Sequence, residues 1–286
     1  MVEKLRENVF SITVNLGSNN SAILTAEGVV LFDTPLKPTD ALSWRKFVDS
    51  LGPTKYIIIS DHHLDHTLTN AFFDGSLISH ELTRSKLQNS APSMEFMSDL
   101  LFHIDPYGEQ YIHGGYAYRI PDVTIAHDCT LTMGDTVIEL FCKKGHTENS
   151  LMAYLPKEKV LFTGDNVCEN SLPCLDQTCL PEVYETLNFI MNDLDVETIV
   201  PGHGAVCTKK EALRFKHWLE SVYESVEKEY RNGLTKDEVI AKLSFPDLIH
   251  CDTDQYRGYP QSHIDGFQIR SYAHVYDVVA GMAMRK

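Results

Sequence analysis

Long hydrophobic runs and a surplus of positive charge are both missing from this sequence. No apolar stretch approaches the ~18 residues that a membrane-spanning helix needs. Lys and Arg number 25 against 40 Asp and Glu, which gives a formal net charge of −15. A field of that sign repels nucleic acid and anionic lipid surfaces. These absences argue against a nucleic-acid or membrane partner, and they leave a small-molecule substrate open.

Paired cysteine motifs and a secretory leader are also lacking. The seven cysteines are odd in number, scattered, and form no C-x-x-C pair, which disfavours a disulfide framework or a structural zinc knuckle. The charged opening, MVEKLRE, contains no apolar segment of the kind that a signal peptide needs. We therefore expect reduced thiols and a cytoplasmic location.

What is present is an ordinary globular composition, with 43% hydrophobic and 23% charged residues. Short β-like runs alternate with single helices in two successive halves, which indicates two packed sheets with helices outside. The expected strands are 10–14, 21–24, 29–32, 56–59, 123–126, 136–141, 150–155, 159–162 and 197–200. The expected helices are 39–51, 69–73, 81–88, 181–193, 209–231, 236–243 and 271–284.

Residues 89–120 fit none of these elements. The segment carries several aromatic side chains among its glycines, including Phe102, Tyr107, Tyr111, Tyr116 and Tyr118. That is too many aromatics for a disordered tail, so we interpret the segment as an ordered flap, with a packing insertion as the alternative. The four tyrosines are then candidate substrate contacts, and they favour an apolar or aromatic substrate.

Side chains able to hold a metal or move a proton follow four of the expected strands. These residues are Asp61, His63, Asp65 and His66 in the segment SDHHLDHT, His146 in GHT, Asp165 in TGD and His203 in PGHG. Three of the four groups adjoin a glycine, where the backbone can approach a metal closely. A single His at a strand end is more often structural, but four such coincidences indicate a site of mixed imidazole and carboxylate ligands.

These motifs resemble those of the metallo-β-lactamase superfamily, and the resemblance covers about residues 8–230. The family pattern is H-x-H-x-D-H, then G-H-T, a Gly-Asp after a strand, and a late Gly-His. The P-G-H-G form is closest to the hydroxyacylglutathione-hydrolase-like branch with its general hydrolases. The resemblance implies an α+β fold, a four-layer αβ/βα sandwich. It implies one domain over residues 1–286, with 89–120 as an active-site flap and 232–286 as a C-terminal helical extension.

The resemblance also implies a dinuclear metal site. The first metal would be held by Asp61, His63 and His146. The second would be held by Asp65, His66 and His203, with Asp165 bridging. Asp33, in the segment LFDTP, matches an early Asp turn of the family and is expected to buttress the site.

One position departs from the family pattern, because Asp61 stands where the first His is expected. Two divalent ions carry +4, and three carboxylates leave +1 where two would leave +2. The harder ligand set favours iron or manganese more than an all-imidazole pocket would, although zinc stays the default. His62 occupies a spacer position and is expected to point elsewhere; replacing Asp61 as a ligand is its alternative role.

The implied activity is hydrolysis of a small-molecule ester, thioester, lactone or amide by a metal-bridging hydroxide, with Asp65 taking up the proton. Two alternatives stay open. One is a di-iron, oxygen-using or persulfide dioxygenase-type enzyme on the same fold. The other is a non-catalytic binding protein on a degraded hydrolase scaffold. The sequence leaves open whether copies of the chain associate into a homo-oligomer.

Overall fold

Two β-sheets packed face to face form the centre of the computed structural model, which describes residues 1–245 and 261–284. The first sheet has seven strands in the order β1 to β7, and the second has five in the order β12-β11-β10-β9-β8. The first sheet consists of β1 (Glu3–Arg6), β2 (Val9–Ile12), β3 (Asn20–Thr25), β4 (Gly28–Phe32), β5 (Thr54–Ile59), β6 (Ser76–His80) and β7 (Val123–Ile125). The second consists of β8 (Cys129–Met133), β9 (Thr136–Cys142), β10 (Leu151–Leu155), β11 (Val160–Cys168) and β12 (Thr198–His203).

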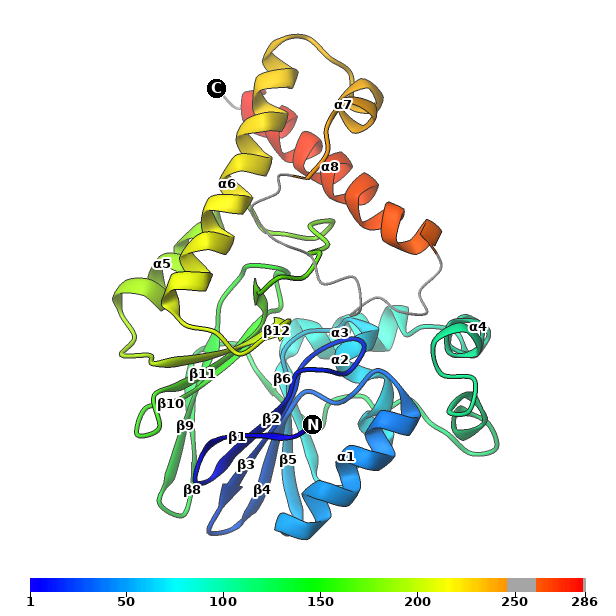
Figure 1. Cartoon of the computed structure of the whole chain (residues 1–286), viewed down its shortest axis with the longest axis vertical. Helices are drawn as coiled ribbons and strands as arrows, with labels where there is room; N and C mark the ends of the chain where they lie inside the picture. The colour runs from blue at the N-terminus through cyan, green and yellow to red at the C-terminus, as the bar shows by residue number, and fades with distance from the viewer. Residues whose placement is uncertain (246–260, 285–286) are drawn as a thin grey trace.

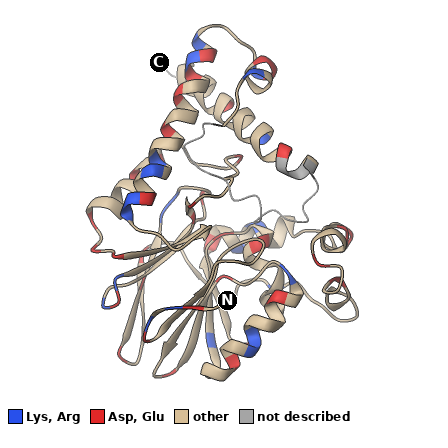
Figure 2. Ribbon diagram, in the orientation of Figure 1, with Lys and Arg blue, Asp and Glu red and all other residues tan. Residues whose placement is uncertain are grey.

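Helices cover the outer faces of both sheets (Figure 1). They are α1 (Pro38–Leu51), α2 (Leu64–Thr67), α3 (Glu81–Ser90), α4 (Met94–Ile104), α5 (Glu182–Asn192), α6 (Lys209–Arg231), α7 (Lys236–Lys242) and α8 (Gln261–Ala283), with 3₁₀ turns η1 (Leu68–Phe72) and η2 (Glu109–Ile112). None of the described helices is both long and apolar enough to cross a membrane. Acidic and basic side chains are interspersed along α1 and α6, so neither helix presents a purely basic stripe (Figure 2).

Three apolar layers hold this arrangement together. Between the sheets, Ile23 and the stacked rings of Phe32 and Phe162, whose centroids are 5.4 Å apart, are buried. On the outer face of the first sheet Trp44 of α1 packs against the strands, and on that of the second sheet Trp218 of α6 does the same. Both faces of each sheet are therefore covered, which explains the near-continuous apolar runs of the central strands. The expected α+β fold, a four-layer sandwich, is confirmed.

Several elements differ from the expected ones. The strand β11 continues to Cys168, so Asp165 lies inside the strand rather than beyond its end. The helix α8 begins at Gln261 instead of residue 271. Strands β1, β6 and β8 were not expected; β1 and β8 are short and largely exposed, which weakens their hydrophobic pattern. Residues 246–260 of the expected C-terminal extension lie outside the described residues, and α7 and α8 share a hydrophobic cluster with α6.

The expectation that residues 89–120 hold no regular element is wrong, because α4 and η2 lie within them. The side chain of Ser93 caps α4 by accepting the N–H of Phe96. The buried face of the helix repeats at the spacing of one helical stripe: Met97, Leu100, Leu101 and Ile104. This stripe packs with Leu16, Leu36 and Leu68, so hydrophobic burial against the first half of the chain orders the segment.

Asp105 ties the end of α4 to the start of α1. Its buried carboxylate accepts hydrogen bonds from the N–H and the hydroxyl of Thr39, both at 2.9 Å. Because Asp105→Ala leaves two donors without their acceptor, we expect the free energy of unfolding to fall by about 1–3 kcal/mol. Urea denaturation measures the loss. Ser43→Ala, which removes an exposed hydrogen bond within α1, is the control; equal midpoints for the two variants would contradict this role.

Candidate metal centre

Four strand ends and loops meet at one edge of the two sheets. The N–H of Leu151 donates to the carbonyl of Ser60 at 2.7 Å, which joins the end of β5 to the start of β10. Gly164 in β11 has a φ of +51°, and a Cβ there would lie 2.6 Å from the Cβ of Ser60. Only glycine therefore lets β11 come this close to β5. These contacts bring three of the four motif segments together, and the pairing of β12 with β11, in which Cys168 lies opposite His203, adds the fourth.

Asp61, His63 and His146 form the first group of potential ligands. Asp61 Oδ2 lies 3.0 Å from His63 Nδ1 and 3.9 Å from His146 Nε2, and these two nitrogens are 3.3 Å apart. Two ligands at ~2.0–2.1 Å on a tetrahedral ion are separated by ~3.4 Å. The three atoms thus already stand near the spacing that one metal ion requires.

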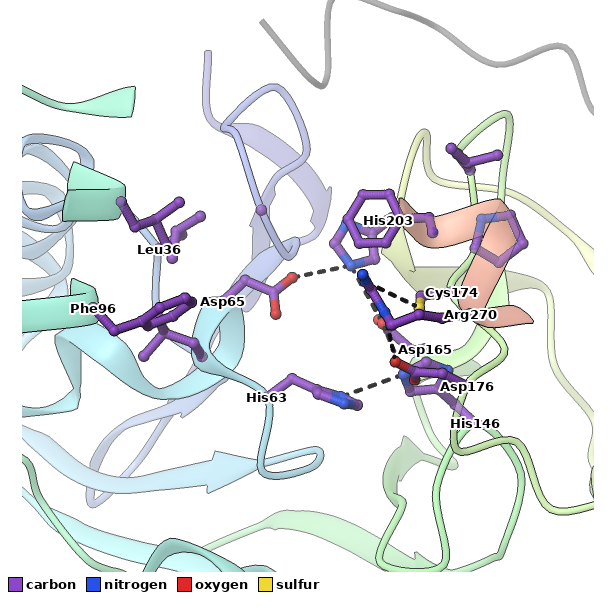
Figure 3. Close-up of a pocket in the computed structure, with 16 residues that line it drawn as sticks. Leu36, His63, Asp65, Phe96, His146, Asp165, Cys174, Asp176, His203 and Arg270 are labelled. Carbon is purple, nitrogen blue, oxygen red and sulfur yellow. Dashed lines mark hydrogen bonds and ion pairs between the residues drawn. The ribbon is translucent and has the colours of Figure 1, made fainter. Parts of the chain in front are cut away.

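Asp65, His66, His203 and Asp165 form the second group. His203 Nε2 lies 3.2 Å from Asp65 Oδ2 and 3.3 Å from Asp165 Oδ2. His66 Nε2 lies 3.4 Å from Asp165 Oδ1 and 3.9 Å from Asp65 Oδ1. Asp165 Oδ2 is also 3.6 Å from His146 Nε2 of the first group. The Asp165 carboxylate therefore lies between the two groups, where a bridging ligand would be (Figure 3).

Two atoms of this cluster show that a cation fits it. His66 Nε2 and Asp165 Oδ1 are buried and have no hydrogen-bond partner among the described residues, although they are 3.4 Å apart. Burying an imidazole nitrogen and a carboxylate oxygen without partners is costly. A divalent cation between them would satisfy both atoms, and the mixed N and O donor set suits zinc, iron or manganese.

The ring of His66 is held from behind by Asp33. Its Nδ1 lies 2.8 Å from Asp33 Oδ2 and 3.0 Å from Ser60 Oγ, and Asp33 Oδ1 accepts the N–H of Ser60. An imidazole that donates Nδ1–H to a carboxylate keeps Nε2 free for a metal. Asp33 adopts a left-handed φ of 55°, a conformation that costs free energy and is common where a site requires it. Asp33 thus lies where the sequence placed a buttress.

Two amide side chains that the sequence analysis missed also position the imidazoles. The Gln177 amide lies 3.0 Å from His63 Nε2, so its oxygen, after an amide flip, can accept Nε2–H when Nδ1 binds a cation. Asn166 Oδ1 accepts the N–H of His146 at 2.8 Å, and a Cβ on Gly145 would clash with that oxygen. Asn166 directly follows the Gly-Asp pair, which is the only local signal for either residue.

Without a cation, protonated histidines offset the negative charge of the aspartates in the cluster. Burial disfavours a charged His63, but the Asp61 carboxylate outweighs burial and raises the pKa of His63 to about 9. Burial likewise opposes a charged His203, and Asp165 overrides it and raises the pKa of His203 to about 10. Burial lowers the pKa of His146. Because a ligating imidazole must be neutral, cation binding at this site releases protons.

His62 lies closer to the first group than the sequence analysis expected. One of its ring nitrogens is within 4.8 Å of donor atoms on Asp61 and His63, and its ring centroid is 4.5 Å from that of His63. Its Nδ1 is buried without a hydrogen-bond partner among the described residues. Burial, together with the charge of His63, lowers the pKa of His62 to about 4. A neutral His62 is therefore an alternative donor beside Asp61.

A cavity of about 270 Å³ opens over the cluster. Its floor contains five of the seven candidate ligands: His63, Asp65, His146, Asp165 and His203. Its walls are mostly apolar: Leu36, Leu64, Phe96, Leu100, Leu172, Pro173 and Phe267. Asp61 and His66 are buried behind the floor. The cluster thus faces a small, largely apolar pocket of the kind that binds small molecules.

None of the four tyrosines of residues 89–120 lines this pocket. Tyr107 and Tyr111 are exposed on the surface, at 82% and 46%. Tyr116 and Tyr118 direct their hydroxyls to the segment of α2 and η1 instead. Residues 89–120 do contribute to the pocket, but through the face of α4 that was not expected to be helical: Phe96 and Leu100.

Tyr118 supports the turn that carries His63 and Asp65. Its hydroxyl contacts Thr67 Oγ1, which donates to the carbonyl of His63 at 2.8 Å. Since loss of such supporting contacts costs 10–100-fold in metal affinity or activity, we expect Tyr118→Phe to weaken metal binding about tenfold. Competition with a coloured chelator measures the affinity. Tyr116→Phe removes a hydroxyl bond outside this turn and is the control; equal affinities in the two variants would rule out the supporting role.

Comparisons with known proteins identify a family and similar folds. The family model described as "Metallo-beta-lactamase superfamily" matches residues 14–203. A metallo-beta-lactamase from Pontibacter korlensis superposes with a TM-score of 0.59 at 20% identity, over 74% of this chain and 95% of that chain. The DIM-1 metallo-beta-lactamase superposes with a TM-score of 0.62 at 18% identity, over 77% and 97%.

A third solved structure extends the similarity to the C-terminal helices. A double mutant of the sec-alkyl sulfatase PisA1 superposes with a TM-score of 0.68 at 13% identity, over 96% of this chain and 49% of that chain. At these identities the solved structures establish the fold alone. The search of curated proteins found no match. Because the family model covers well over half of the sequence, this chain belongs to the metallo-beta-lactamase superfamily.

Proposed function

We propose that the chain is a metal-dependent hydrolase of a small-molecule ester, thioester, lactone or amide with a dinuclear site. The observation that carries the proposal is the convergence of seven donors, spread over more than 140 residues of sequence, into two groups. Neighbouring donor atoms in these groups lie 3.0–3.9 Å apart. The Asp165 carboxylate links the groups. A structural role would not require buried, unpaired ligand atoms that face each other.

Divalent cations held there would lower the pKa of water and polarise a carbonyl oxygen. Asp65, which lines the pocket and lies 3.2 Å from His203 Nε2, would take up the proton of an attacking water. No thiol is needed as nucleophile. Cys174 is the one cysteine among the described residues that line the pocket, and it is held as a neutral thiol because burial raises its pKa to about 11.

Zinc is the default cation, and Asp61 is the reason to test iron and manganese beside it. A carboxylate in the first group makes that site more negative and its ligand set harder than three imidazoles would. Iron at this site would also permit oxygen chemistry, so the experiment also has to test the dioxygenase-type alternative.

The decisive experiment combines elemental analysis of freshly purified protein with a hydrolysis panel and an oxygen electrode. We expect about two divalent ions per chain and hydrolysis that a chelator abolishes. Less than one ion per chain, with no hydrolysis after zinc, manganese or iron is added, would favour a non-catalytic binding protein. Oxygen uptake without hydrolysis would favour the redox alternative.

A further inference from the structure

The described lining of the pocket over the cluster contains one fixed positive charge. Among the sixteen described residues that line it, Arg270 is the only Lys or Arg, and the remaining fixed charges are aspartates. Arg270 lies on α8, on the same side of the cavity as His203 and Asp165, across from Phe96 and Leu36 (Figure 3). In a chain with a net charge of −15, a cation at this place calls for a specific reason.

The present contacts of Arg270 are weak enough to be exchanged for contacts with a ligand. Its Nε lies 3.1 Å from Asp176 Oδ2, its Nη2 lies 3.8 Å from Cys174 Sγ, and its guanidinium carbon is 5.3 Å from the ring centroid of Phe267. The Arg270 and Asp176 side chains are 47% and 27% exposed. Ion pairs with this exposure contribute little to stability. A second carboxylate can therefore take the place of Asp176 at small cost.

Anchoring of α8 does not explain Arg270 well. The helix is held by buried apolar contacts of Tyr272, Val275 and Val279. A separate surface ion pair joins Lys236 of α7 to Asp277 of α8, away from the pocket. The guanidinium instead stands at the boundary between an apolar wall and the candidate metal ligands.

We propose that Arg270 binds a carboxylate of the substrate, so that the site acts on amphipathic esters, thioesters, lactones or amides that carry this anion away from the scissile bond. The inference rests on the proposed hydrolase function and names its substrate class. The planar fork of a guanidinium matches a carboxylate in two parallel hydrogen bonds. The apolar part of the substrate packs against Leu64, Phe96 and Leu100, while the scissile carbonyl faces the floor.

The test compares two esters that differ only at the far end of the acyl chain, 4-nitrophenyl valerate and mono-4-nitrophenyl glutarate. For metal-loaded Arg270→Gln we expect the ratio of kcat/KM for the glutarate to kcat/KM for the valerate to fall about tenfold, mainly through KM. Arg270→Lys should restore part of the ratio, since it keeps the charge and loses the fork. Asp176→Asn should raise the ratio about two- to fivefold by freeing the guanidinium.

Lys236→Gln removes a cation bonded to the same helix outside the pocket, and it should leave the ratio unchanged. An unchanged ratio in Arg270→Gln, or an equal fall in Lys236→Gln, overturns the inference.

Calorimetry with 4-phenylbutyrate and 4-phenylbutanamide separates this inference from the proposed function. If the wild type cleaves neither ester, the hydrolase proposal fails. A tenfold loss of affinity for phenylbutyrate in Arg270→Gln, without a matching loss for phenylbutanamide, still supports carboxylate binding by Arg270. If wild type and Arg270→Gln bind phenylbutyrate with equal affinity, the inference that Arg270 binds a carboxylate is overturned.

Discussion

Asp165→Asn should reduce turnover by about 10³-fold or more and remove about one cation per chain, while the fold remains intact. Asp165 is the carboxylate that reaches both groups, with oxygens 3.3 Å from His203, 3.4 Å from His66 and 3.6 Å from His146. Asparagine keeps the shape of the side chain but loses its charge, so cations held by the two groups would lose an anionic ligand. The measurements are kcat/KM on the best substrate of the panel and metal content by elemental analysis.

The same substitution at an exposed aspartate provides the control for this prediction. Asp195→Asn makes the same chemical change on a side chain that is 79% exposed and bonded to Lys159, so it should leave rate and metal content unchanged. The melting temperature of Asp165→Asn will also fall, because a bound cation that is present far above its dissociation constant stabilises the folded state by several kcal/mol. Full metal content together with a wild-type rate in Asp165→Asn would disprove the bridging assignment.

Asp61→Ala should lose the cation of the first group and reduce turnover by about 10²–10³-fold, whereas Asp61→His should stay active and shift metal preference toward zinc. The Asp61 carboxylate is buried, contacts His63 Nδ1 and accepts the N–H of His63 at 2.7 Å. Alanine removes both contacts. Histidine supplies an imidazole nitrogen in place of a carboxylate oxygen, which softens the ligand set. Metal content and the activity ratio with zinc, manganese and iron measure both effects.

His62→Ala is the matched control, because His62 is the neighbouring side chain with a free buried nitrogen. If Asp61 is the ligand, His62→Ala keeps its metals and most of its activity. If Asp61→Ala retains full occupancy and rate while His62→Ala loses them, the ligand of the first group is His62. The two variants therefore decide between assignments that the sequence pattern left open.

The sequence predicted the helices and strands whose hydrophobic pattern is contained within their own residues. The helix at 209–231 was predicted to its ends, because its amphipathic stripe lies within its own residues; in the structure a capping box of Thr208 and Glu211 marks its start. The helix α4 was not predicted, because its apolar stripe spans only eleven residues within a segment whose composition, rich in aromatics and glycine, is typical of a loop. The tyrosines of that segment were singled out by composition alone, and composition does not determine which side of a turn a ring faces.

The sequence by itself indicated the candidate donor residues, because His and Asp recur in four separate motifs, three of them beside glycine, and such motifs are a local signal. Gly202 illustrates this: a Cβ there would lie 1.9 Å from an Asp165 oxygen. Only the tertiary structure decided what supports and surrounds those donors. Gln177 reaches His63 across 114 residues of sequence, and Arg270 reaches Asp176 across 94. Such contacts arise from packing between distant segments, and packing of that kind leaves no periodic or local signal in the chain.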